Sequence, residues 1–300
     1  MKDVVKAIEN SGIRAVVSWC ITDGSIRNKP EETIEYAQKY NHDENSRITV
    51  YTSAHASYTC NPDTMKLVVD LAKKLNTGIH IHLSETLEEE NQIRAKYGKT
   101  PTEYLNDLEV FDVPVILAHG IHFSQSDLAL IQNIKGGVSH NPISNCKLAS
   151  GICDVVELRK RGIKVGLGTD GTGSTSTLDL FEEMKTTAFL QKIKHMDPEA
   201  IKAYSILKMA TIEGAEVLGL QEQIGTIEVG KKADIIMIDT SSLRFTPEND
   251  IATTLVYAAN GNDVITTIVD GKVIMENRKF LYSDEEVVKE HVKQNAKRLL

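Results

Sequence analysis

The feature that most constrains the fold is a regular alternation of short apolar runs with longer amphipathic stretches. Six short runs are long enough for strands: residues 13–20, 48–55, 78–83, 115–121, 137–140 and 164–170. Between them lie stretches with the spacing of helices, at residues 62–75, 86–106 and 154–161. This alternation predicts a parallel sheet covered by helices, either an open doubly wound sheet or a closed barrel.

Residues that can carry chemistry stand at or just beyond the C-terminal ends of these runs. They are His55, His82 with Glu85, His119, His140 with Asn141, and Asp170. In a (β/α)8 barrel all strand ends of this kind converge on one mouth, whereas in an open sheet they are spread along an edge. The repeated polar ends therefore favour the barrel.

The segment from Gly78 to Glu85 has the layout that a metal and a proton carrier need. Side chains alternate along a strand, so His80 and His82 point to the same face, and Glu85 follows just past the strand end. His80 lies one layer deeper than His82, which favours a packing role for it. The alternative is that both histidines are buried in a polar core layer and that Glu85 only begins the next helix.

His82 and Asp170 are the best candidates for protein ligands of a divalent metal, which we expect to be zinc. A catalytic zinc takes His and carboxylate ligands and keeps one position open. The alternative for Asp170 is a turn residue before Gly171, because Asp-Gly pairs are common in turns. His119 could polarise water or substrate, or it could be a core histidine bonded to a neighbouring backbone group. The remaining histidines, at positions 42, 122, 195 and 291, are expected to be solvated.

The run from Gly166 to Gly171 matches the dinucleotide pattern G-x-G-x-x-G, but we do not expect a nucleotide cofactor there. An aspartate inside the turn would oppose a pyrophosphate, and no second βαβ strand with a terminal acid follows.

Charge and composition exclude some classes of partner and location. The formal net charge of -8 and the lack of a basic run argue against nucleic acid and acidic membranes. No apolar run reaches the roughly 18 residues of a membrane span. The four cysteines show no CxxC spacing, so reduced thiols in a cytoplasmic protein are expected.

The sequence pattern changes after about residue 220. Helical segments at residues 178–194 and 198–218 are followed by short strand-like runs at 225–230, 233–239, 264–270 and 272–276. The last two runs predict a hairpin on Asp270-Gly271, and a charged helix is expected over 284–300. We therefore predict a barrel domain over residues 1–220 and part of a small β-sandwich, with a terminal helix, over 221–300.

With these residues identified, the chain resembles the amidohydrolase superfamily, most closely the branch of 5-methylthioadenosine/S-adenosylhomocysteine deaminases and related chlorohydrolases. The resemblance covers essentially the whole chain. It rests on SAHASYTC at 53–60, HIHLSET at 80–86, LAHG at 117–120, SHNPISNCKLASG at 139–151 and GTDG at 168–171, with further support at 178–185 and 225–234.

The resemblance implies a metal-dependent-hydrolase (β/α)8 barrel in which His82 and Asp170 bind the metal. Glu85 would shuttle protons to the ring nitrogen and the leaving amine, and would also contact the substrate. His119 would assist at the metal and His55 would touch the substrate.

We expect His140 and Asn141 to contact the substrate as well. The implied reaction is the deamination of S-adenosylhomocysteine, methylthioadenosine or adenosine, with guanine deamination and triazine dechlorination as variants on the same fold. Two departures bear on the substrate: the family usually has Gly-Pro before the substrate histidine and Pro after it, where this chain has Ser53-Ala54 and Ser57. The loop at 172–177 also differs from the commoner asparagine-rich version.

The largest departure is at the front of the chain. The family has eight barrel strands and an HxH metal motif on the first, whereas six strands and no HxH ahead of His55 are identifiable here. We therefore expect an incomplete barrel, strands 3 to 8, in an N-terminally truncated product. The alternative to a deaminase is accordingly a catalytically silent fragment, and the expected partners are a nucleoside, a complementing N-terminal fragment or a second copy of the chain.

Overall fold

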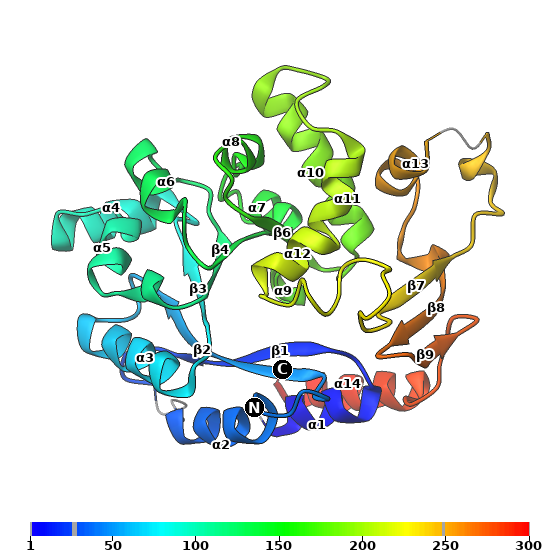
Figure 1. Ribbon diagram of the computed structural model, residues 1–300, viewed down its shortest axis with the longest axis horizontal. Helices are drawn as coiled ribbons and strands as arrows, with labels where there is room; N and C mark the ends of the chain where they lie inside the picture. The colour runs from blue at the N-terminus through cyan, green and yellow to red at the C-terminus, as the bar shows by residue number, and fades with distance from the viewer. Residues whose placement is uncertain (1, 26–28, 248–249, 300) are drawn as a thin grey trace.

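The computed structural model describes residues 2–25, 29–247 and 250–299. Its centre is a six-stranded parallel sheet whose strands follow chain order (Figure 1). The strands are β1 (Ala15–Ile21), β2 (Ile48–Ala56), β3 (Ile79–Leu83), β4 (Val115–His119), β5 (Gly136–His140) and β6 (Val165–Leu167). All six predicted strands are therefore confirmed, each within a few residues of its expected bounds.

The first helix precedes β1 and the others follow strands or helices along the chain, and helices cover the outer side of the curved sheet (Figure 1). They are α1 (Lys2–Ser11), α2 (Pro30–Tyr40), α3 (Pro62–Leu75), α4 (Leu87–Tyr97), α5 (Pro101–Asp107), α6 (Gln125–Ile131), α7 (Pro142–Lys147), α8 (Val155–Lys160), α9 (Thr172–Thr175), α10 (Leu180–His195), α11 (Ala203–Met209) and α12 (Ile212–Val217), with a 3-10 turn at Val110–Asp112. None of the helices in the described part of the chain is both long and apolar enough to cross a bilayer.

Along strand β3, alternate side chains face either the apolar core or the side of the sheet that carries the candidate site residues. Ile79, Ile81 and Leu83 are buried against the outer helices. The two histidines between them are partly accessible and lie on the opposite face, with ring centroids 6.3 Å apart. Because alternate residues of a strand share a face, the packing of the apolar residues fixes the direction of both imidazoles.

The central sheet stays open within the described residues. β1 is paired only with β2, and β6 only with β5. A six-stranded parallel α/β sheet with this strand order matches the incomplete barrel expected from the sequence.

Two predicted helices are each divided in two. The stretch at 86–106 breaks after Tyr97, because Gly98 adopts φ +70° and Thr100 starts a new helix with a capping box to Glu103. The stretch at 198–218 becomes α11 and α12, which are separated at Ala210 and Thr211. Continuous helices were therefore the wrong prediction at both places.

The C-terminal part contains one antiparallel sheet in the order β10-β9-β8-β7. Its strands are β7 (Ile235–Ile238), β8 (Val264–Val269), β9 (Lys272–Glu276) and β10 (Lys279–Phe280). The predicted hairpin is confirmed: Asp270 and Gly271 have φ values of +53° and +75°, as its tight turn requires. The strand expected at 225–230 is absent, since these residues form turns and irregular backbone, and β10 was not predicted.

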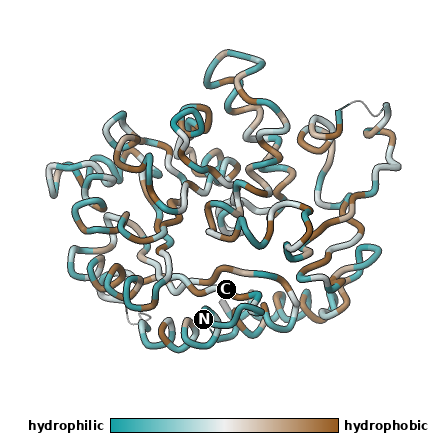
Figure 2. The backbone as a smooth tube through the Cα atoms, in the orientation of Figure 1, coloured by the Kyte–Doolittle hydropathy of each residue, from teal (hydrophilic) through white to brown (hydrophobic). Residues whose placement is uncertain are grey.

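The rest of this part is helical: α13 (Ile251–Tyr257), α14 (Glu285–Leu299) and 3-10 turns at Leu243–Phe245 and Gly261–Asp263. Phe245, Val256 and Ala259 are buried in the same apolar core as the central sheet. In contrast, α14 is exposed along its described length and lies beside α1, below β1 (Figure 1). In Figure 2, much of the backbone tube in this region has the colour of hydrophilic residues. A boundary near residue 220 stays a prediction.

Candidate active site

The ends of neighbouring strands bring three imidazole rings together. The ring centroids of His55 and His82 are 5.0 Å apart, and those of His82 and His119 are 5.4 Å apart. These residues come from the C-terminal ends of β2, β3 and β4, which are adjacent in the sheet. The order of the strands is therefore what gathers residues that are far apart in the sequence.

His82 is held in one tautomer by the backbone. Its Nδ1 lies 2.6 Å from the carbonyl oxygen of His55. A carbonyl oxygen only accepts hydrogen bonds, so Nδ1 must carry the ring proton. The lone pair of Nε2 is then available to a metal, which is the usual arrangement of a ligand histidine.

His119 is almost fully buried and faces Glu85. Its Nδ1 is 2.8 Å from Asn145 Oδ1, and its Nε2 is 3.6 Å from Glu85 Oε2. Burial holds the pKa of His119 below its ordinary value, although Glu85 and Asn145 act in the opposite direction. His119 also has φ +78°, a rare backbone conformation for a residue with a side chain.

Asp170 lies three residues beyond the end of β6 and is also left-handed, with φ +62°. The Ser144 hydroxyl donates to its Oδ2 at 2.7 Å, and the Gly171 amide donates to Oδ1. Burial acts to raise the pKa of Asp170, but these hydrogen bonds and the nearby rings of His119 and His82 outweigh it and keep the pKa below its ordinary value. The carboxylate of Asp170 is thus stabilised in its charged form, close enough to His119 and His82 to interact with their rings.

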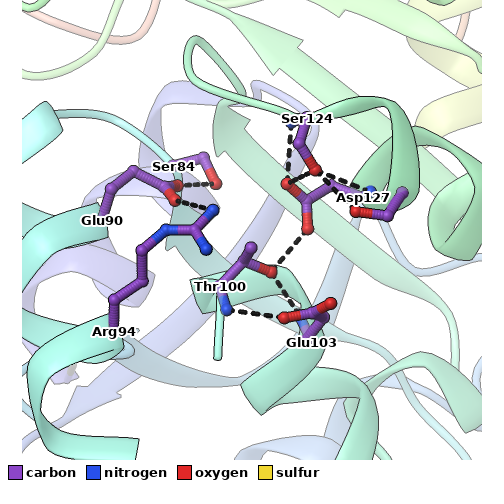
Figure 3. Close-up of polar contacts among 8 residues, drawn as sticks. Ser84, Glu90, Arg94, Thr100, Glu103, Ser124 and Asp127 are labelled. Atoms are coloured by element: carbon purple, nitrogen blue, oxygen red, sulfur yellow. Dashed lines mark hydrogen bonds and ion pairs between the residues drawn. The ribbon is translucent and has the colours of Figure 1, made fainter. Parts of the chain in front are cut away.

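The turn that carries Glu85 is fixed from several sides. Ser84 has φ +51°, and its carbonyl oxygen accepts the amides of Ile121 and His122 at 2.9 and 3.0 Å. Its hydroxyl donates to Glu90 at 2.9 Å, and Figure 3 shows Glu90 reaching back from α4 to this turn. The loop after β3 is therefore tied both to α4 and to the loop after β4.

A second buried carboxylate lies next to this turn. Figure 3 shows that Asp127 accepts hydrogen bonds from the Thr100 and Ser124 hydroxyls. Asp127 has no exposed surface, and these bonds join the starts of α5 and α6. Satisfied polar groups of this kind make the helices behind the site rigid.

His55 closes the site on the side of β2. Its Nδ1 is 2.9 Å from Thr59 Oγ1, and the ring of Tyr58 meets it edge-on with centroids 5.9 Å apart. Burial, together with the neighbouring His82, lowers the pKa of His55. The ring is therefore neutral at pH 7 and can contact an uncharged substrate group.

His140 and Asn141, at the C-terminal end of β5, are buried. His140 has no exposed surface, and burial lowers its pKa to about 3. Among the described residues, neither of its ring nitrogens has a hydrogen-bond partner. Asn141 lies against Gly168, where a Cβ would be only 2.3 Å from Asn141 Oδ1. Glycine at 168 therefore makes room for this amide.

The other histidines are His80, which is partly accessible on β3, and several peripheral ones. Burial lowers the pKa of His80 to about 4, so its ring is neutral, and its packing role stays a prediction. His122 was expected to be solvated, which is wrong: it is only partly exposed, and its Nε2 is 2.8 Å from the carbonyl oxygen of Ser150.

Two of these side chains have the chemistry of metal ligands. His82 offers Nε2, and Asp170 offers a carboxylate with a lowered pKa. No cluster of three or more His, Cys, Asp or Glu side chains suited to a metal occurs in residues 2–25, 29–247 and 250–299. The described part of the chain thus supplies these two as its candidate ligands.

Sequence reasoning missed the residues that hold this site in place. Asn145, Ser144 and Glu89 contact His119, Asp170 and the Glu85 amide, respectively. Asn145 and Ser144 lie inside the conspicuous segment 139–151, but no spacing rule indicates which atoms they reach. Glu89 could only have been read as a helix-capping residue three positions after Thr86.

Comparison with known proteins identifies the family. The amidohydrolase family profile matches residues 1–274. A 5-methylthioadenosine/S-adenosylhomocysteine deaminase of Caldanaerobacter subterraneus is 43% identical over 304 residues, which cover 100% of this chain and 70% of that protein. A 5'-deoxyadenosine deaminase of Methanobrevibacter smithii is 44% identical over 293 residues, covering 96% of this chain and 67% of that protein.

Solved structures agree. An adenosine deaminase from Xanthomonas campestris with bound zinc superposes with a TM-score of 0.93 at 30% identity, covering 98% of this chain and 68% of that one. The atrazine chlorohydrolase of Arthrobacter aurescens, also with zinc, has a TM-score of 0.88 at 20% identity and the same coverage, a likeness of fold alone. On the profile match and the sequence identities together, this chain belongs to the amidohydrolase family.

Proposed function

We propose that this protein is a metal-dependent hydrolytic deaminase that acts on the adenine ring of a nucleoside and releases ammonia. The observation that carries the proposal is the position of Glu85: its carboxylate is 3.6 Å from His119 Nε2, and it follows the strand that presents His82. Deamination needs a proton carrier at this place. The names of the relatives indicate S-adenosylhomocysteine, methylthioadenosine or another adenosine derivative as substrate.

His82 and Asp170 would hold the divalent metal, which we propose to be zinc. The carbonyl of His55 and the hydroxyl of Ser144 orient these two ligands. When bound, the metal acts as a Lewis acid and lowers the pKa of a water molecule toward neutrality.

The side chains of this chain would then carry the protons. Water adds to the ring carbon that bears the amino group, a C–O bond forms, and the C–N bond to the amino group breaks. Glu85 takes one proton of the water and passes it to the adjacent ring nitrogen. It then takes the remaining proton from the new hydroxyl and delivers it to the departing amine, so that ammonia leaves as the carbonyl forms. His119 would assist at the attacking water through Nε2, the ring nitrogen that faces Glu85.

The substrate contacts follow from the same geometry. His55 is neutral and partly exposed beside His82, so it can hydrogen-bond the nucleoside. Asn141 and His140 are buried at the C-terminal end of β5, and we expect them to contact the substrate from there. A cytoplasmic location and association with a second copy or a complementing segment stay predictions.

A panel of substrates tests the proposal directly. The zinc-loaded protein is incubated with S-adenosylhomocysteine, methylthioadenosine, adenosine, guanine and a chlorotriazine, and both ammonia and the ultraviolet change of the purine are followed. We expect the highest kcat/KM with one of the first three. Preference for guanine or the triazine would overturn the substrate class, and no turnover by folded, metal-loaded protein would favour a catalytically silent chain.

A further inference from the structure

The first turn of α4 contains a buried carboxylate that the proposed reaction does not use. Only 2% of the Glu89 surface is exposed. Its Oε1 accepts the hydroxyl of Ser57 at 2.7 Å, and its Oε2 accepts the backbone amide of Glu85 at 2.9 Å. Both oxygens are thus engaged by groups from outside the helix.

These two hydrogen bonds join two loops of the candidate site. Ser57 follows His55 in the loop after β2 and is itself 2% exposed. Glu85 follows His82 in the loop after β3. One side chain therefore sets the loop of the proposed substrate histidine against the loop of the proposed proton carrier.

Helix capping does not account for this placement. Thr86 is the N-cap of α4, and its Oγ1 accepts the amide of Glu89 at 3.1 Å. In a capping box the glutamate would return to the amide of the N-cap residue. Here the carboxylate passes Thr86 and reaches the amide of Glu85 instead.

The burial of Glu89 is energetically unfavourable, which makes its position informative. Burial raises its pKa to about 7, even though Ser57 and the Glu85 amide act to lower it. The neighbouring Glu88 is exposed, and its carboxylate accepts a local bond from Gln92 at 3.0 Å. An exposed acidic residue such as Glu88 is sufficient to stabilise the start of a helix. The buried carboxylate of Glu89 therefore indicates a second role, which is to hold the two loops together.

We propose that Glu89 is a positioning residue that fixes the Glu85 turn through its two hydrogen bonds. This inference rests on the proposed function, in which Glu85 carries protons. Glu85 Oε2 is 3.6 Å from His119 Nε2. A shift of about 1 Å in a reacting group can lower turnover by about 100-fold.

Two near-isosteric variants separate hydrogen bonding from packing. In Glu89→Gln, the amide oxygen can accept the Glu85 amide, and the amide nitrogen can donate to the Ser57 oxygen, so both contacts survive without the charge. In Glu89→Met, the size is retained and both contacts are lost. Glu88→Gln and Glu88→Met are the matched controls on the solvent side of the same turn.

Each variant is measured as the zinc-loaded 300-residue protein in two ways. Hydrogen exchange of the Glu85 amide, by NMR, reports the position of the turn without any need for turnover. Steady-state kinetics on the best substrate of the panel separates kcat from KM, and bound zinc and Tm are recorded alongside.

We expect Glu89→Met to speed exchange of the Glu85 amide at least 10-fold and to lower kcat by about 10-fold to 100-fold with KM within twofold. Glu89→Gln should restore both values to within about threefold of the parent. Unchanged Glu85 exchange in Glu89→Met, or a loss of kcat that Glu89→Gln does not rescue, would overturn the proposal. A parent without turnover would count against the proposed function, and the exchange measurement would still decide whether Glu89 holds the turn.

Discussion

The Nδ1 atom of His82 lies 2.6 Å from the carbonyl oxygen of His55, so a backbone group of one strand orients the imidazole of the next. Since β2 and β3 are adjacent and parallel, this bond depends on the register that pairs Ala56 with His82. The carbonyl fixes the ring tautomer and leaves Nε2 facing the site. We therefore propose that sheet pairing and metal affinity are coupled at this residue.

The first prediction compares the two histidines of β3. His82→Gln should weaken zinc binding by about 100-fold or more, because it removes the proposed nitrogen ligand. His80→Gln is the matched control on the same face of the same strand, and it should change zinc affinity by less than about threefold. Zinc titration against a chromophoric chelator measures both. Equal losses in the two variants would contradict the assignment of His82.

The second prediction concerns the proton carrier. Glu85→Gln keeps the size of the side chain and removes its basicity, so the protein should retain its zinc and lose about 100-fold or more in turnover. Elemental analysis beside the deamination assay measures both quantities. Loss of zinc together with activity would make Glu85 a metal ligand instead, and near-normal turnover would remove it from the mechanism.

The third prediction uses the contact between His119 and Asn145. Asn145→Asp places a carboxylate 2.8 Å from His119 Nδ1, where the amide oxygen now lies. A negative charge at this distance favours the imidazolium, so the pKa of His119 should rise by about one unit or more. NMR titration of the metal-free protein follows the ring, and the exposed His195 serves as an internal control. A His119 pKa that does not move would show that Asn145 is not its partner in solution.

The sequence predicted those features that follow from periodicity. Buried parallel strands are nearly continuous apolar runs, so all six were found, and the period of two placed His80 and His82 on one face. Helix breaks were not predicted, because they depend on local backbone choices such as the left-handed Gly98. The irregular backbone at 225–230 has the composition of a strand, but it lacks a pairing partner in the described chain.

The supports of the site could not be predicted, because they are contacts between distant residues. His119 and Asn145 are 26 positions apart, and Ser57 and Glu89 are 32 apart. The left-handed backbone of Ser84, His119 and Asp170 also has no signal in the sequence, since none of these residues is glycine. Such strain is typical of functional sites and is maintained by the surrounding hydrogen bonds.

The last prediction concerns the pH dependence of stability and the buried carboxylate of Glu183 on α10. This residue has no exposed surface, and its oxygens accept the Ile143 amide at 3.0 Å and the Thr175 hydroxyl at 3.4 Å. Burial raises its pKa from 4.5 to about 7. Between these two pH values the folded protein binds more protons than the unfolded chain, so the contribution of Glu183 to stability falls as pH rises and is constant above pH 7.

Replacing Glu183 with Gln should remove this pH dependence while both hydrogen bonds are kept, because an amide can accept from the Ile143 amide and donate to Thr175. The free energy of unfolding of Glu183→Gln minus that of the parent should therefore be about 1 to 3 kcal/mol larger at pH 8 than at pH 5. Urea denaturation in the presence of a chelator measures this difference at the two pH values. The matched control is Glu182→Gln, since Glu182 is exposed on the same turn and should show no such change. An equal response of the two variants would mean that the carboxylate of Glu183 is not buried in solution as it is in the fold described here.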